Sequence, residues 1–299
     1  MTYRFSEAVT MVRAACLLLC ICATAVGAAD NDASIRDSAV RQYPDQAAAV
    51  SETVQRADQA GVPADTLTRI LSRSSQAGVP ASDFIHILNN LSQAGETGLP
   101  LAPFSEKVME GLAKEVAPAL IVQVLDKKLA TYREAQRIVA ESTAQAKPDA
   151  RAVVAVALSF ERGISPQGMQ ALLTEQGYEP APVGHAAQAL ADLVSMGFNE
   201  GEGVAIVRAG LDAGYLQKGG ATLTQIVAQA QKLGFGNDAI AQRMVTALNR
   251  GTPMAEISLE LHGGNRRGGN RGGNDGWGHG GAQSGGAGGH GNGGGRHAN

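Results

Sequence analysis

The chain has 299 residues, a formal net charge of −3 and 44% hydrophobic residues, which is enough apolar material to build a sizeable core. The three cysteines, Cys16, Cys20 and Cys22, lie close to the N-terminus. The remainder of the chain therefore has no disulfide, no thiolate metal site and no cysteine nucleophile.

A secretory signal peptide is predicted for residues 1–28. Arg4 and Arg13 precede an apolar run over residues 14–26, which ends in small residues. A basic N-terminal region, a short apolar segment and small residues at the cleavage site are typical of such signals. The apolar run is too short for a permanent membrane span. A lipoprotein signal is the alternative, but the residues before the two candidate cysteines are bulky. We therefore expect a periplasmic or secreted protein with no stable membrane span after cleavage.

A repeated unit of a turn followed by an amphipathic helix organises the predicted folded region, residues 29–261. Gly-x-Pro turns begin at Gly61, Gly78 and Gly98, and a degraded turn begins at Glu115, so that the spacings are 17, 20 and 17 residues. Glycine adopts positive φ without steric cost after a helix, and proline fits the first turn of the next one. The same spacings separate four glycines further along the chain, Gly197, Gly214, Gly234 and Gly251.

Between these turns, apolar residues recur at helical spacing, as in Phe84, Ile87, Leu88 and Leu91. A helix of about 12 residues is marginal in water and must bury its apolar stripe against neighbouring helices. Two units span 34 to 37 residues, a length found in helix-pair repeats. The sequence therefore predicts an all-α array of helical-hairpin repeats, an α-solenoid, in which residues 30–50 form an N-terminal cap.

Two stretches depart from the regular pattern, which resumes between them at Ser165 and Pro166. Residues 127–146 are charged and alanine-rich, lack the turn residues and are expected to be helical. Ser165 and Pro166 are a predicted N-cap and first helical residue. The stretch 177–184 contains two glycines and two prolines and predicts a longer loop or a bend between two halves of the array, although the glycine spacing argues for unbroken stacking. Gly203 falls inside a predicted helix and is expected to tolerate alanine.

The C-terminal segment, residues 262–299, has a different composition. Glycine accounts for 18 of its 38 residues and almost nothing in it is apolar, so it is predicted to be a disordered tail. Its net charge is +3, whereas that of the folded region is −7. Two Arg-Gly-Gly boxes suggest weak contact with a polyanion, and a simple spacer is the alternative. The candidate contact residues are Arg266, Arg267, Arg271, Trp277 and Arg296.

The run KVMEGLAKEVAP at residues 107–118, together with the Gly-x-Pro turns, resembles a group of exported helical-repeat proteins of proteobacteria. The resemblance covers residues 50–260. It implies a helical-repeat fold and export, and it transfers no site residue and no function. The sequence departs from the pattern at Glu115, where the turn favours glycine.

No catalytic, cofactor or metal site is predicted. His86 and His185, the two histidines of the folded region, have no second ligand at metal-binding spacing, and the four tail histidines lie in glycine-rich sequence. No Gly-x-Ser-x-Gly turn is present. Carboxylates such as Glu106, Glu110 and Glu134 are spread along helix faces, and sequence does not show whether any of them converge.

These features favour a non-catalytic binding or scaffold protein of the cell envelope, with an unknown envelope protein or peptide as its partner. The acidic folded region predicts a cationic or neutral partner. One alternative is a structural or adhesion protein that attaches to polyanions through its tail. A hydrolase of envelope polymers is a second alternative.

Overall fold

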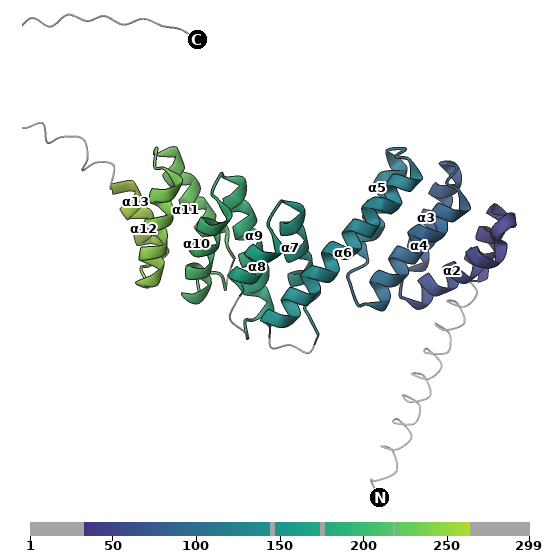
Figure 1. The fold of residues 1–299 in the computed structure, drawn as a ribbon, viewed down its shortest axis with the longest axis horizontal. Helices are drawn as coiled ribbons and strands as arrows, with labels where there is room; N and C mark the ends of the chain where they lie inside the picture. The colour runs from purple at the N-terminus through teal and green to yellow at the C-terminus, as the bar shows by residue number, and fades with distance from the viewer. Residues whose placement is uncertain (1–32, 144–146, 174–176, 218, 264–299) are drawn as a thin grey trace, which may run out of the picture.

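The structure, a computed structural model, describes residues 33–143, 147–173, 177–217 and 219–263. This part of the chain is all-helical; it contains no strand, only an isolated bridge between Thr143 and Tyr178. The helices form an elongated body with the N-terminal helices at one end and the C-terminal helices at the other (Figure 1). The predicted signal peptide and the five predicted polyanion contacts of the tail lie outside the described residues.

Residues 33–42 are helical and lead into short helices of the N-terminal end. The elements that follow are η1 (Pro44–Gln46), α2 (Ala47–Gln59), α3 (Ala64–Gln76), α4 (Ala81–Glu96), α5 (Ala102–Ala113), α6 (Pro118–Ser142), α7 (Ala150–Glu161), α8 (Pro166–Leu172), α9 (Pro180–Ser195), α10 (Glu200–Asp212), α11 (Ala221–Lys232), α12 (Asn237–Asn249) and α13 (Met254–Gly263). None of the helices in the described ranges is long and apolar enough to cross a membrane.

The predicted glycine turns end the helices as expected. Gly78, for example, has a φ of 62°, and its N–H donates to the Ser75 carbonyl at 3.1 Å. The next residue, Val79, donates to the Ser74 carbonyl at 2.9 Å and is buried. These two hydrogen bonds and the positive φ define a Schellman motif, which satisfies the last carbonyls of the helix. The downstream glycines of the same spacing also have positive φ.

The degraded turn keeps the same geometry without a glycine. Glu115 has a φ of 53° and is the only non-glycine residue with positive φ in the described part of the chain. Its N–H donates to the Leu112 carbonyl at 3.3 Å, and the Val116 N–H donates to the Gly111 carbonyl at 3.0 Å. The turn at Glu115 therefore ends α5 in a conformation that an L-residue adopts at a cost of about 1–2 kcal/mol.

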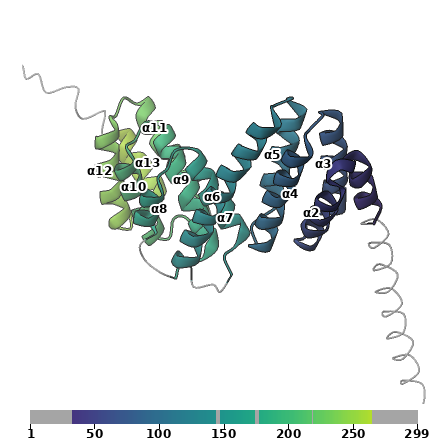
Figure 2. The ribbon, with the colours of Figure 1, turned by 45° about the vertical axis from the view of Figure 1, so that its right-hand side comes forward.

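Helices two apart in the chain pack side by side and form two rows. The even-numbered helices pack in the order α2, α4, α6, α8, α10 and α12. Among the odd-numbered helices, α3 packs on α5, and α7, α9, α11 and α13 pack in sequence. Between these two odd-numbered groups, α5 and α7 each pack on α6 (Figures 1 and 2).

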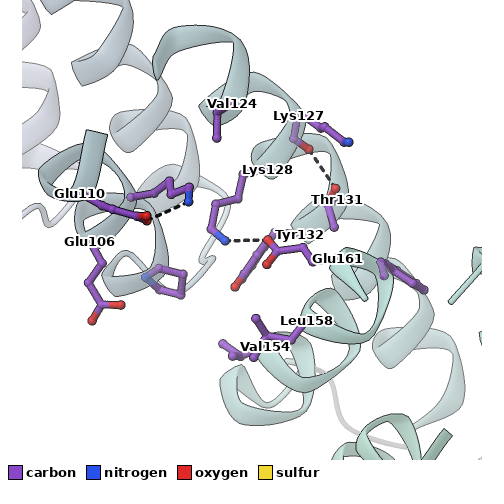
Figure 3. A pocket seen from close by; sticks show the side chains of 13 residues that line it. Glu106, Glu110, Val124, Lys127, Lys128, Thr131, Tyr132, Val154, Leu158 and Glu161 are labelled. Atoms are coloured by element: carbon purple, nitrogen blue, oxygen red, sulfur yellow. Dashed lines mark hydrogen bonds and ion pairs between the residues drawn. The ribbon is translucent and has the colours of Figure 1, made fainter. Parts of the chain in front are cut away.

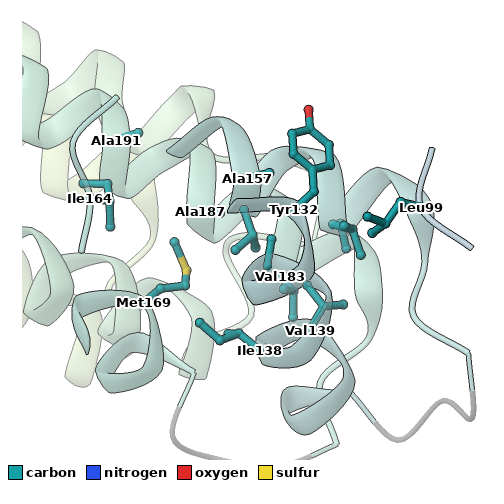
Figure 4. Packing of buried hydrophobic residues seen from close by; sticks show 14 of the residues in the cluster. Leu99, Tyr132, Ile138, Val139, Ala157, Ile164, Met169, Val183, Ala187 and Ala191 are labelled. Carbon is teal, nitrogen blue, oxygen red and sulfur yellow. The ribbon is translucent and has the colours of Figure 1, made fainter. Parts of the chain in front are cut away.

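Helix α6 is the longest element, with 25 residues and a length of about 37 Å. The prediction that the chain stays helical beyond Lys127 is confirmed as far as Ser142. Because no turn interrupts α6, this one helix packs with α4 and α5 and also with α7 and α8 (Figure 2). The core follows the same course, and Figure 4 shows it continuing from Leu99 and Tyr132 to Ile164 and Met169.

One local prediction was wrong. The expected longer loop at 177–184 is instead mostly helix, because α9 begins at Pro180 and includes Pro182 and Gly184. Both prolines occupy the first turn, where no intrahelical N–H donor is needed. The candidate boundary between two halves at this place stays a prediction.

Gly203 is buried in α10, and a Cβ built there would lie 2.8 Å from Leu190 Cδ1 of α9. Alanine at this position requires the end of the Leu190 side chain to shift, and the expected tolerance stays a prediction. Ser165, in contrast, caps α8 as predicted, since its Oγ accepts a hydrogen bond from the Gly168 N–H at 2.9 Å.

A candidate binding groove at the junction of helices α5, α6 and α7

A groove of about 890 Å³ opens where α5 and α7 flank α6 (Figure 3). A second hollow of about 590 Å³ continues from it between α7, α9 and Pro100, and a third of about 280 Å³ continues along α5 and α6. We call the three together the α6 groove. Its floor and walls include Glu106, Lys107, Glu110, Lys114, Leu120, Val124, Lys127, Lys128, Tyr132, Arg151, Val154, Ala155, Leu158, Glu161 and Arg162.

Exposed apolar side chains gather in this groove. Four large hydrophobic residues of the described chain are exposed, and three of them, Leu120, Val124 and Leu158, line the α6 groove at 49%, 36% and 44% exposure. The fourth, Leu259, lies on α13. Isolated exposed apolar residues are ordinary, but a group of them in one hollow marks a binding surface.

Tyr132 of α6 anchors the floor of the groove. Its ring is fully buried and packs edge-on against Phe104 of α5, with centroids 5.1 Å apart. Its hydroxyl is buried and has no hydrogen-bond partner in the structure. Burial and, to a smaller degree, the nearby carboxylates of Glu161 and Glu106 raise the pKa of Tyr132 to about 12, so the phenol is neutral at ordinary pH.

An ion pair joins α6 to α7 directly over this tyrosine. Lys128 Nζ lies 2.7 Å from Glu161 Oε1 and 4.8 Å from the centroid of the Tyr132 ring (Figure 3). The Lys128 side chain is only 11% exposed, so the pair and the cation–π contact are partly desolvated. Together they hold α7 against the middle of α6.

The α5 wall carries a second set of charges. Glu110 Oε2 accepts a hydrogen bond from Lys107 at 2.8 Å, and its Oε1 accepts one from Lys114 at 2.6 Å. These hydrogen bonds, and then the positive charges of both lysines, lower the pKa of Glu110 to about 2. Glu110 is therefore ionised at every physiological pH, the opposite of what a general acid requires.

The groove is positively charged on an otherwise acidic body. Six basic side chains line it, against three acidic ones, which gives a net charge of +3. The basic residues are Lys107, Lys114, Lys127, Lys128, Arg151 and Arg162, and the acidic ones are Glu106, Glu110 and Glu161. Lys127 and Arg151 take part in none of the ion pairs among the described residues.

Neither His86 nor His185 belongs to a metal site in the described part of the chain, and the side chains of the four tail histidines lie outside it. His86 is exposed on α4, and His185 Nδ1 lies 2.8 Å from the carbonyl oxygen of Leu216. Within the described ranges, no group of three or more His, Cys, Asp and Glu side chains could hold a metal ion. Glu202 has a raised pKa because it faces Asp238, but it lies at the exposed start of α10, away from the groove.

Sequence reasoning missed the groove residues Val124, Tyr132 and Leu158. The signal available was indirect: Leu120 and Val124 are four residues apart and lie off the buried stripe that contains Ile121 and Leu125. Such a second apolar pair on one helix indicates a second contact surface.

Comparisons with known proteins do not assign this chain to a family. A scan of protein-family models, a search of curated proteins and a search of solved structures each gave no match.

Proposed function

We propose that this is a non-catalytic, exported binding or scaffold protein built of α-helical repeats, and that the α6 groove is its binding site. The proposal of export rests on the basic and apolar N-terminal sequence. The proposed partner is a protein or peptide of the cell envelope.

The repeat array is supported by two independent features. The turns with positive φ recur at steps of 17 and 20 residues, and helices two apart in the chain pack on each other in two rows. Each helix thus buries its stripe against its neighbours, as expected for stacked helical hairpins in an α-solenoid. Arrays of this kind supply extended surfaces for binding other proteins.

One observation carries the binding role: of the four large hydrophobic side chains that are exposed in the described part of the chain, three lie together in the α6 groove. Leaving these side chains in water costs about 25 cal/mol for each Å² of apolar surface, a cost that a partner would remove. A hydrolase is less well supported, because the pKa of Glu110 in this groove is shifted downward rather than toward neutrality.

Affinity capture tests the proposal. The mature chain would be compared with Val124→Asp and Leu158→Asp variants and with a chain that ends at Gly263, each incubated with envelope extract. We expect the two groove variants to lose captured proteins that the shortened chain retains. Both substitutions are at exposed positions, so unchanged helical circular dichroism is expected and serves as the folding control. Capture that depends on the tail and ignores both groove substitutions would instead favour the adhesion alternative.

A further inference from the structure

We infer that the occupant of the α6 groove is an acidic amphipathic helix of another protein, which lies between α5 and α7 and completes the row of odd-numbered helices. This inference rests on the proposed function and names the chemistry of the partner.

The helix packing defines the shape of the occupant. In the odd-numbered row, α3 packs on α5, and α9 packs on α7, but α5 and α7 are each supported by α6. The α6 groove lies at this interruption, and its two flanking helices each have 12 residues. A helix of about that length, laid on α6, would meet the exposed side chains of Val124 and Leu158 and the half-buried Val154. Recognition of an amphipathic helix in a groove of this kind uses apolar anchors at i, i+3, i+4 and i+7.

The charge of the groove defines the polar face of the occupant. The central hollow between α5 and α7 is lined by three basic and three acidic side chains. The net charge of +3 of the whole groove comes from Lys114, Arg151 and Arg162 in its two extensions, whereas the folded region as a whole has −7. Lys127 on α6 and Arg151 on α7 are exposed, and neither forms an ion pair with another described residue. Carboxylates flanking the apolar stripe of the partner helix would pair with these two cations, and a cationic helix would be repelled. This inference differs from the expectation of a cationic or neutral partner, which was drawn from the overall charge of the folded region.

The chain's own segments fit less well. The tail, residues 262–299, has a net charge of +3 and is nearly half glycine, so its composition suits neither the charge nor the helical form of the site. A second copy could offer the outer face of α13, where Leu259 is exposed beside Glu256 and Glu260. That face has a single large apolar side chain, whereas the groove offers several.

Fluorescence anisotropy with designed peptides tests the inference. Two labelled helical peptides of about four turns share the same leucine stripe; one carries glutamate and the other lysine at the flanking positions. We expect the mature protein to bind the acidic peptide at least about tenfold more tightly than the basic one at low salt, and to lose much of this preference when salt screens the charges.

Three variants locate the binding. Leu158→Asp should weaken binding of the acidic peptide by at least about tenfold, because it places a charge in the apolar floor. The double variant Lys127→Glu/Arg151→Glu should abolish the preference for the acidic peptide. Lys232→Glu/Arg250→Glu, which makes the same charge change at exposed positions on α11 and at the end of α12, is the matched control and should leave binding unchanged.

Equal binding of the two peptides, or acidic-peptide binding that Leu158→Asp leaves intact, would overturn the inference. So would concentration-dependent self-association in sedimentation that Leu259→Asp abolishes, because the occupant would then be a second copy. If capture from envelope extract depends on the groove while the peptides bind equally, the proposed function stands and only the acidic helix is wrong. If neither capture nor peptide binding depends on the groove, both fail.

Discussion

The stretch from α3 to α5 and the stretch from α6 to α7 use the same kind of helix but produce different surfaces. In the first, a positive-φ residue closes each helix, a glycine after α3 and α4 and Glu115 after α5, the turns lie 17 or 20 residues apart, and α3 packs directly on α5. In the second, no turn falls between Pro118 and Ser142, and α6 continues as one helix beneath both α5 and α7. Regular turns therefore give a filled row, and the loss of one turn opens a groove.

The largest effect is expected where two helices of the regular region approach most closely. A Cβ at Gly95 of α4 would lie only 2.1 Å from the carbonyl oxygen of Ala60 at the end of α2. This oxygen belongs to the backbone, so it cannot rotate away as the end of a side chain can. Gly95→Ala should therefore lower the free energy of unfolding by about 3 kcal/mol or more. Gly184→Ala is the matched control, because its Cβ would make ordinary contacts at 3.6 Å with Ala155 Cβ. Urea unfolding measures both, and equal losses would contradict this account of the close approach.

A smaller loss is expected when a regular turn is given a side chain. Gly78 has a φ of 62°, and nothing lies within 4 Å of a Cβ built there, so only backbone strain opposes a substitution. Gly78→Val should cost about 1–2 kcal/mol of stability, because a β-branched residue is penalised at positive φ. Thermal unfolding monitored by circular dichroism measures it. A neutral result would mean that the turn relaxes to negative φ.

The reverse change should stabilise the irregular turn. Glu115 adopts a φ of 53° at the turn between α5 and α6, where its neighbours keep the hydrogen bonds of a glycine turn. Glu115→Gly should raise the free energy of unfolding by about 0.5–1 kcal/mol, because the strain is removed at some cost in chain entropy. Urea unfolding of this variant beside Gly78→Val compares the two turns directly. A loss of stability at Glu115→Gly would show that the carboxylate has a role that its backbone does not reveal.

The smallest effect concerns the charges on the α5 wall. Hydrogen bonds from Lys107 and Lys114 lower the pKa of Glu110 to about 2. Because the folded pKa lies below the unfolded value, the stabilising contribution of this carboxylate is complete above about pH 4.5 and is lost as the pH falls toward 2. Carboxyl NMR titration should find Glu110 well below an ordinary glutamate in the natural chain and near 4.5 in Lys107→Ala/Lys114→Ala. An unchanged pKa in that double variant would exclude the lysines as the cause.

Much of the fold follows from local sequence. Gly-Val-Pro at Gly61 and Gly78 determines a helix end and the next helix start within three residues, and helical apolar spacing identifies the buried faces, as with Phe84 and Ile87. The stretch with Pro180 and Pro182 was predicted to be a loop because proline disrupts helix interiors. Both prolines instead lie in the first turn of α9, where proline is accepted.

The candidate site was largely beyond prediction from sequence. The exposure of Val124 and Leu158 depends on the distance between α5 and α7 where they pack on α6. That distance is set by the packing of three helices and cannot be deduced from the sequence of any one of them. The contact at Gly203 was hidden from sequence for the same reason, since Leu190 is 13 positions away in the chain and belongs to another helix. The sequence places Glu110 on an exposed helix face. Only the structure shows that Glu110 and its two paired lysines form a wall of the groove.

Site-specific photocrosslinking from the α6 groove tests the central claim most directly. A benzophenone side chain would replace Leu158 in one chain and Ala140 in another; Ala140 is exposed on α6, about 160° around the helix from Val124. After irradiation in intact cells, the account predicts a discrete crosslinked protein from position 158 and none from position 140. Equal products from both positions, or none from position 158, would contradict the groove as the binding site.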